Sequence, residues 1–349
     1  MKSGFVRMQV STIIATCALL IIPVAASAQA KTDSPIGFEF SPAHAPNPTS
    51  QDIVQAALEI AAVSGHGSYM WEWKSGDAGY TTMQGVVSLC RLLGLKVFLQ
   101  LSIAGVGQVA PPDNLPQSFA DATVRQRFLD DVAKVASLKP DYLNLGAEAN
   151  FIYYFNPNEF PLYVSLYQQA YNKVKSISPN TQVGVSYHLD LFFAKSEFNL
   201  LTGLGPQDFI AFTTYPAWTV YQGYYPAPDQ MAAAYYDRIR LVIPNKPVIF
   251  SEVGWPSAGL GSQSDQDKFV RSLPRYFANV KPVLVTFAME HDIDHFSVDA
   301  FNNLQLLVLE QSGVDIVELF LELNTVGLLS TDGPPKQAYI SAGSLNFAP

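Results

Sequence analysis

The stretch KPVIFSEVGWPSAG, residues 246–259, ends an apolar strand on a carboxylate and then turns sharply. Val248, Ile249 and Phe250 form the apolar run, and Glu252 is the carboxylate that follows it. A carboxylate directly after a buried strand is costly unless it is used or paired. Barrel enzymes present their catalytic acids at the carboxyl ends of strands in this way. The stretch therefore predicts a barrel with Glu252 at its active end.

A second stretch of the same kind, DYLNLGAEAN at residues 141–150, ends on Glu148. In a barrel the fourth and seventh strands lie across the mouth from each other, so carboxylates at their ends can flank a bond held there. Paired carboxylates of this kind suggest glycoside hydrolysis. A separation of roughly 5–5.5 Å suits a retaining enzyme and roughly 6.5–9.5 Å an inverting one.

Apolar strand-like runs alternate with helix-like segments along the chain, which is the pattern of a parallel α/β protein. Amphipathic segments between the strands carry apolar residues at three- and four-residue spacing, which predicts helices. The predicted strands are 37–41, 67–73, 96–103, 142–148, 182–188, 209–215, 247–252 and 282–290, and the predicted helices include 50–64, 121–138, 160–176 and 229–242.

Eight strand and helix repeats in one run, without a linker, predict a single (β/α)8 TIM barrel over residues 31–349. The competing architecture is a doubly wound open sheet, which needs a Gly-rich phosphate loop after its first strand. Glu39, Phe40 and Pro42 stand there instead. The apolar tail 302–329 is predicted to form the last outer helix or helices, interrupted at 325–327.

Residues 1–30 have the pattern of a secretory signal peptide: Lys2 and Arg7, an apolar run over 10–24, then small residues suited to cleavage. A membrane anchor is the alternative, but the run is shorter than the ~20 residues that a spanning helix needs. A lipid anchor at Cys17 is a further alternative. We therefore expect a secreted or periplasmic protein.

Without residues 1–30 the chain carries 19 basic and 30 acidic side chains, a net charge of about −11. Such a protein repels nucleic acid and anionic membranes, so we expect neither as a partner after signal cleavage, and we expect a monomer. Cys90 is then the only cysteine, which excludes an intrachain disulfide. Its apolar helical surroundings predict a core residue.

These strand-end residues resemble glycoside hydrolase clan A, the retaining (β/α)8 group, over nearly all of residues 31–349. Within the clan, residues 248–259 look like the nucleophile signature of the family 17 β-1,3-glucanases and are also similar to the corresponding strand of the family 53 galactanases. The resemblance implies Glu252 as nucleophile and Glu148 as acid/base.

Ala147 departs from the clan pattern, which places an Asn directly before the acid/base. That Asn is expected to hydrogen-bond the sugar 2-hydroxyl, a contact that strengthens in the transition state. Three interpretations follow: another residue such as Asn150 supplies the contact, the substrate differs at C2, or the protein binds sugar with weak or no turnover. Strand eight departs as well, with Ala288 to Asp292 where the clan often has a sugar-stacking Trp.

Other strand ends carry groups suited to sugars, since rings stack on pyranose C–H faces and polar groups hold hydroxyls. Strand alternation puts Trp71 and Trp73 on one face and Glu72 on the other, and core packing is the alternative for both rings. In the clan an aromatic or His after strand six commonly contacts the nucleophile, which points to Tyr215, with core packing as its alternative. The predicted substrate-binding residues are Glu39, Trp71, Trp73, Asn150, Tyr187, His188, Tyr215, Trp218, Trp255 and Glu290.

His291, Asp292, Asp294 and His295 form the only dense His/Asp cluster of the sequence. A metal site is one interpretation, but cleavage by two carboxylates needs no metal, and loops at a barrel mouth collect polar residues. We predict no metal and no cofactor. The chain also lacks a Gly-x-Ser-x-Gly elbow, a Walker loop and paired zinc cysteines.

The sequence thus predicts a retaining β-glycoside hydrolase whose oligo- or polysaccharide substrate, by resemblance alone, is a β-linked glucan. Two alternatives stay open. A non-catalytic or weakly active sugar-binding protein would use the same barrel, and a transglycosylase would pass the sugar of the covalent intermediate to another sugar.

Overall fold

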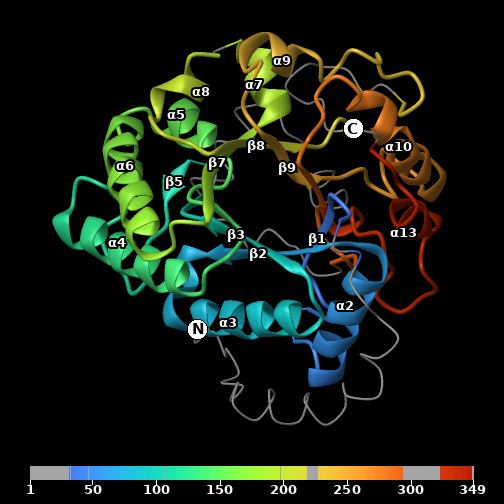
Figure 1. The fold of residues 1–349 in the computed structure, drawn as a ribbon, viewed down its shortest axis with the longest axis horizontal. Helices are drawn as coiled ribbons and strands as arrows, with labels where there is room; N and C mark the ends of the chain where they lie inside the picture. The colour runs from blue at the N-terminus through green and yellow to red at the C-terminus, as the bar shows by residue number, and fades with distance from the viewer. Residues whose placement is uncertain are drawn as a thin grey trace.

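A closed barrel of parallel strands forms the centre of the computed structural model (Figure 1). The structure describes residues 31–347 except 32, 46, 106, 197, 218–226 and 294–322. Within these residues the strand order around the barrel is β1, β10, β9, β8, β7, β6, β3, β2. The barrel strands are β1 (Ile36–Glu39), β2 (His66–Glu72), β3 (Lys96–Ser102), β6 (Tyr142–Asn144), β7 (Gln182–His188), β8 (Phe209–Thr214), β9 (Val248–Val253) and β10 (Leu284–Phe287).

All eight predicted strands are present, and the predicted (β/α)8 barrel is confirmed. Two strands end at least three residues earlier than predicted. β6 stops at Asn144, so Glu148 lies in the turn beyond it, and β10 stops at Phe287. A small antiparallel hairpin of β4 (Ala104–Gly105) and β5 (Gln108–Val109) follows β3.

Helices surround the barrel (Figure 1). Three of the predicted helices are confirmed within two residues at each end, as α2, α4 and α6. The prediction for 229–242 is wrong in length, because only α9 is helical there and the residues before it form turns that send the Tyr236 ring into the core. The helices are α2 (Ser50–Val63), α3 (Gly76–Leu92), α4 (Ala122–Ser137), α5 (Asn150–Phe155), α6 (Phe160–Ile177), α7 (Leu189–Lys195), α8 (Leu200–Gly203), α9 (Arg238–Val242), α10 (Gln263–Tyr276) and α13 (Gln337–Ala342), with a 3-10 turn η1 (Trp73–Ser75).

Local sequence sets several helix starts. Thr49 and Asp52 form a reciprocal capping box at α2, and the Asp121 side chain accepts hydrogen bonds from two backbone N–H groups at the start of α4. Such caps satisfy donors that have no partner within the helix and each contribute about 1 kcal/mol.

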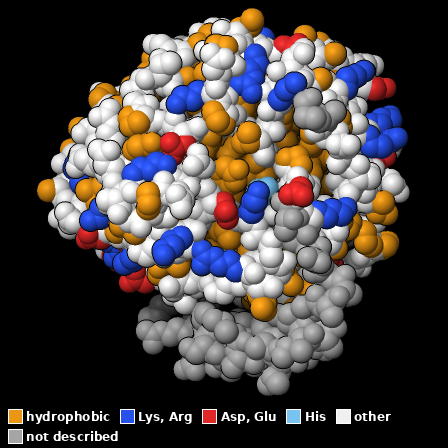
Figure 2. All heavy atoms as spheres, in the orientation of Figure 1, with side chains coloured by type: hydrophobic (Ala, Val, Ile, Leu, Met, Phe, Trp, Pro, Cys, Tyr) orange, Lys and Arg blue, Asp and Glu red, His pale blue; other side chains and the backbone are white. Residues whose placement is uncertain are grey.

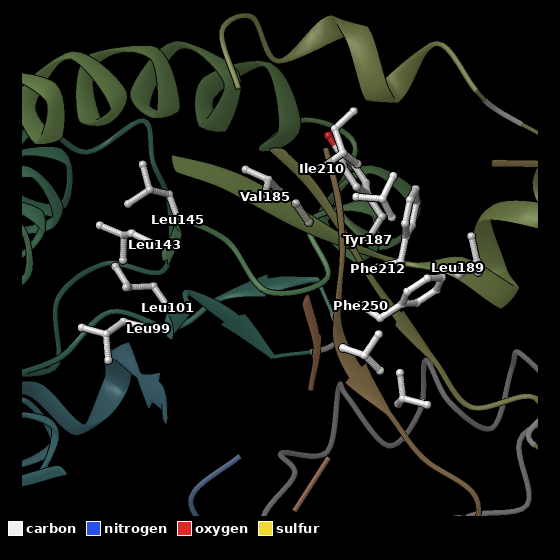
Figure 3. Close-up of a cluster of buried hydrophobic side chains, with 14 of the residues drawn as sticks. Leu99, Leu101, Leu143, Leu145, Val185, Tyr187, Leu189, Ile210, Phe212 and Phe250 are labelled. Carbon is white, nitrogen blue, oxygen red and sulfur yellow. The ribbon is translucent and has the colours of Figure 1, made fainter. Parts of the chain in front are cut away.

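The main core lies between the strands and the helices. Side chains such as Leu99, Leu143, Val185 and Phe250 leave the strands toward the helix layer (Figure 3). Cys90 on α3 is buried in this layer, as predicted. The barrel interior instead holds a buried polar group, in which the Asn144 Nδ2 donates to Gln100 Oε1 (3.1 Å) and Ser186 Oγ (2.9 Å). This polar layer lies beneath the turn that carries Glu148.

Two predicted segments lie wholly or mostly outside the described residues. They are the signal peptide at 1–30 and the tail helices at 302–329, of which the structure describes only the end, from 323. Among the residues that the structure does describe, no helix is long and apolar enough to cross a membrane.

Candidate active site

Glu252 stands at the carboxyl end of β9, where the pairing with β8 shifts. Phe212 pairs with Phe250, but Thr213 pairs with Glu252, so Ser251 is an extra residue in β9. Such a bulge re-aims the side chain that follows it. The irregularity therefore provides the local reason why Glu252 leaves the regular strand pattern at this point.

The Glu252 carboxylate has one firm partner. The Tyr215 hydroxyl, just beyond β8, donates a hydrogen bond of 2.6 Å to Glu252 Oε2. No described residue hydrogen-bonds Oε1, although only 8% of the residue's surface is exposed. One carboxylate oxygen is thus held, and the other is left to react.

Tyr215 is itself held from two sides. Its backbone N–H donates to Asp190 Oδ2 (3.0 Å), and Asp190 also accepts from the Tyr235 hydroxyl. Gly254 allows the ring to lie against the chain after β9, because a Cβ there would be 2.6 Å from the Tyr215 Cε1. The predicted contact of Tyr215 with Glu252 is confirmed, and burial together with Glu252 raises the pKa of the phenol, which keeps it a donor.

Glu148 lies in the turn after β6 with φ of +51°. Non-glycine residues rarely adopt this left-handed conformation, which costs about 1–3 kcal/mol and clusters at functional sites. The Glu148 backbone N–H donates to Ser186 Oγ (3.0 Å), and Glu148 Oε1 accepts from the Thr213 hydroxyl (2.7 Å). The strained turn and the Thr213 bond from β8 together hold the carboxyl at the mouth.

The pKa of each of the two carboxyl groups is raised above its ordinary value. Burial, and next the charge of Glu252, raise the pKa of Glu148 to about 8, although the Thr213 hydrogen bond opposes this. Burial also raises the pKa of Glu252, to about 7, and the Tyr215 hydrogen bond holds it lower than burial alone would. Because the charge of one carboxylate raises the pKa of the other, one of the two groups keeps its proton when the other ionises. One protonated and one ionised carboxyl group are what a general acid and a nucleophile require.

Glu39 is the third carboxyl group at this end of the barrel. Burial, then the charges of Glu252, Glu72 and Glu148, raise its pKa well above the ordinary value. A protonated Glu39 can donate a hydrogen bond, as neutral buried carboxylic acids do in other active sites. The structure thus brings Glu39 to the predicted pair, while Glu72 is 58% exposed and pairs with Lys74 (3.2 Å).

The structure describes four aromatic side chains, besides Tyr215 and His188, that were predicted to bind substrate. All four are core residues. Trp71 and Trp73 are 1% and 0% exposed, and the Trp73 Nε1 donates to Asp131 on α4 (2.9 Å). Alternation was right about their shared face, but that face points to the helices. Tyr187 and Trp255 are likewise buried in the main core, where the Trp255 ring packs on Phe269. These predictions are corrected, because a sugar cannot reach rings covered by helices.

Asn150 and His188 support the site from behind. The Asn150 side chain exchanges two hydrogen bonds with the His188 backbone (2.8 and 3.1 Å) and is fully buried, so it cannot replace the missing Asn at Ala147. The His188 ring lies 6.4 Å from the Tyr215 ring, and burial lowers its pKa to about 4. His188 is therefore a neutral packing partner of Tyr215.

Glu290 points away from the mouth, contrary to prediction. Met289 has φ of +58°, which breaks the strand alternation after β10, and the Glu290 carboxylate turns toward Glu59 on α2. Trp218 lies outside the described residues.

Figure 2 shows one face of the molecule, where hydrophobic side chains gather near the centre and charged ones surround them.

Sequence reasoning missed Thr213 and Ser186 as groups that hold the site. The available signal was their position, since each lies within the last three residues of a strand. Small polar residues there can serve packing or catalysis equally, so only the contacts identify them.

Comparison with known proteins shows which solved structures share this fold. No protein-family model and no curated protein matches the sequence. Among solved structures, a GH5_18 protein from Bifidobacterium longum subsp. longum, in complex with Manβ1-4GlcNAc, has a TM-score of 0.64 over 88% of this chain and 77% of that one, at 14% identity. The fold is that of clan A glycoside hydrolases.

Two further matches span other members of this fold. An exo-β-1,4-mannosidase from an Opitutaceae bacterium has a TM-score of 0.67 over 91% of this chain and 61% of that one, at 13% identity. A GH53 catalytic domain from Ignisphaera aggregans has a TM-score of 0.52 over 93% and 92%, at 12% identity. The predicted likeness to the clan A barrel is thus confirmed at the level of fold, whereas the particular likeness to family 17 stays a prediction.

Proposed function

We propose that the chain is a retaining β-glycoside hydrolase. The observation that carries the proposal is the pair of buried carboxyl groups at the ends of β6 and β9, in which the charge of Glu252 helps to raise the pKa of Glu148. Each has a hydroxyl donor that fixes one of its oxygens, Thr213 for Glu148 and Tyr215 for Glu252. The barrel fold shared with glycoside hydrolases supports the same chemistry.

In the first step Glu148 donates its proton to the glycosidic oxygen while Glu252 Oε1 attacks the anomeric carbon. The leaving sugar departs with that proton, and the remaining sugar is joined to Glu252. In the second step the Glu148 carboxylate accepts a proton from water, whose oxygen attacks the same carbon and releases Glu252. Tyr215 disperses the charge of Glu252 whenever the carboxylate is free.

The substrate class proposed is a β-linked glucan or a related polysaccharide. Ala147 offers no hydrogen bond to a 2-hydroxyl, and Asn150 is turned away, so the contact at C2 that the clan normally makes is missing. One of the structural matches is named an exo-β-1,4-mannosidase and another is in complex with Manβ1-4GlcNAc, and mannose is the C2 epimer of glucose. The substrate panel must therefore include β-glucosides and β-mannosides alongside β-1,3-glucan and β-1,4-galactan.

The test compares three variants on the best substrate of this panel. Glu252→Gln and Glu148→Gln should each lower kcat by at least about 10³-fold while sugar binding persists, because each removes one partner of the double displacement. Asp130→Asn is the matched control. It alters an exposed carboxylate on the outer helix α4 and should retain full activity. Unchanged turnover in either Gln variant contradicts the proposal.

The missing Asn also favours a second candidate, a sugar-binding protein with weak or no turnover. Ligand binding measured by calorimetry, with no product from any substrate of the panel, would identify it. Products longer than the starting oligosaccharide would instead indicate transglycosylation, which shares the covalent intermediate.

We also propose that the protein is exported, on the basis of the signal pattern in residues 1–30. Expression of the whole chain in a bacterial host, followed by mass measurement of the extracytoplasmic form, should show cleavage after Ala28 or Ala30. A full-length chain retained inside the cell would contradict export.

A further inference from the structure

Three side chains meet between the end of β10 and helix α2, behind the barrel mouth. They are Glu59 from the third turn of α2, and Glu290 and His291 from the segment that follows β10. One potential ligand atom from each lies within 4.8 Å of the other two. Nothing in the proposed hydrolysis uses any of the three.

Glu290 is aimed into this group by the backbone. The left-handed turn at Met289 reverses its face, and the Glu290 backbone N–H is held by Ser41 Oγ (2.7 Å) and the Glu39 carbonyl (3.1 Å). The side chain is 0% exposed. No N–H or hydroxyl group of the described residues donates to either carboxylate oxygen, and the neighbour that they face is a second carboxylate, that of Glu59. A buried carboxylate without a partner is among the costliest groups that a protein can contain.

His291 presents a lone pair to the same place. Its Nδ1 lies 3.2 Å from the Ser41 carbonyl oxygen, which can only accept, so Nδ1 carries the hydrogen and Nε2 is left as the acceptor. Nε2 lies 3.4 Å from Glu59 Oε2, and Nδ1 lies 3.9 Å from Glu290 Oε2. Glu59 Oε2 too accepts from no N–H or hydroxyl group of the described residues, while Gln55 donates to the other oxygen of Glu59 (2.8 Å). Acceptors from all three side chains therefore converge where a positive charge is needed.

We propose that Glu59, Glu290 and His291 bind one divalent transition-metal ion. Ligands about 2.1 Å from a tetrahedral zinc ion are about 3.4 Å from each other, and His291 Nε2 and Glu59 Oε2 have that separation. Two carboxylates and a neutral imidazole balance the charge of a divalent ion. The Ser41 carbonyl then acts as the outer partner that fixes the ring of a metal-binding histidine.

The ligand set selects among cations. Calcium takes 6–8 oxygen ligands, and magnesium prefers an octahedral shell of oxygens, whereas one imidazole with two carboxylates suits zinc or manganese. Glu59, 23% exposed, provides the route of entry and leaves room for water as a fourth ligand. Bound there, the ion would tie the end of β10 to α2, directly behind the strand that carries Glu39. We expect a structural role.

Zinc itself is the probe. The whole protein is stripped with a chelator and dialysed, zinc is titrated by calorimetry, and bound zinc per chain is measured by mass spectrometry of the elements. The wild type should bind one equivalent and unfold at a higher temperature with zinc than without it. Glu290→Gln should weaken zinc binding by at least about tenfold, since even the loss of an outer partner costs about 10–100-fold.

Two more variants keep the test decisive. Glu59→Gln alters a partly exposed ligand and should weaken binding in the same way even if Glu290→Gln folds poorly. Asp332→Asn removes an exposed carboxylate that contacts His44 (3.1 Å) and should bind zinc like the wild type. If the wild type binds no zinc, or if both Gln variants bind one equivalent as tightly as the wild type, the proposal is wrong, and shared protons rather than a metal fill the cluster.

Discussion

Removal of the Tyr215 hydroxyl tests how the site controls its nucleophile. In Tyr215→Phe the 2.6 Å hydrogen bond to Glu252 is lost, while burial remains. A hydrogen bond to a charged group contributes about 1.5–3 kcal/mol, and one pKa unit corresponds to about 1.4 kcal/mol. The bond stabilises the carboxylate form, so its loss raises the pKa of Glu252 by about 1–2 units, from about 7 to about 8–9.

The consequence is a shift of the acid limb of the pH profile. At pH 7 the ionised fraction of Glu252 falls from about one half to about 1–10%, so kcat/KM should fall about five- to fiftyfold and recover partly at higher pH. The measurement is kcat/KM from pH 5 to pH 10 for both proteins.

Tyr171→Phe is the matched control, because its hydroxyl donates to another carboxylate, Asp208 (2.9 Å), on the outside of the barrel. It should leave the profile unchanged. If Tyr215→Phe also leaves the acid limb where it was, the reasoning from hydrogen bond to nucleophile pKa is refuted.

Three further predictions concern stability and packing. The pKa of Glu148 is higher in the folded than in the unfolded chain. Its contribution to the free energy of unfolding is therefore fully present below the unfolded pKa of Glu148 and is lost as pH rises through about 8. Glu148→Gln should match the unfolding temperature of the wild type at pH 4.5 and exceed it at pH 9. Gly254→Ala should displace the Tyr215 ring, costing about 1–3 kcal/mol of stability and lowering kcat, whereas Gly203→Ala, with nothing within 4 Å of the new Cβ, should do neither. Trp73→Phe should lower the unfolding temperature and leave KM unchanged, because the ring is a core residue; a raised KM with unchanged stability would restore its role in binding.

The sequence was informative where a local pattern decides the structure. Apolar runs that end on carboxylates located the strands of Glu148 and Glu252, because burial forces strands of a barrel to be apolar and leaves their ends polar. The hydrogen bond between Tyr215 and Glu252 confirms the expected contact after strand six.

The sequence was uninformative where long-range contacts decide which way a side chain points. Alternation put Trp71 and Trp73 on one face, but which face pointed to the helices depended on the closure of the barrel. Glu290 was placed at the mouth by counting along the strand, and the turn at Met289 reversed it. Asn150 has the right chemistry for a sugar, but the backbone of His188 uses both of its polar atoms.

The central claim is that Glu252 forms a covalent bond to the substrate. The direct measurement is the mass of the peptide containing Glu252 after incubation with a 2-deoxy-2-fluoro-β-glycoside of the preferred sugar, which slows release of the intermediate. The proposal predicts one fluorosugar attached to Glu252, and no adduct in Glu252→Gln. An active enzyme that carries no adduct, or carries it on Glu39 or Glu148, would contradict it.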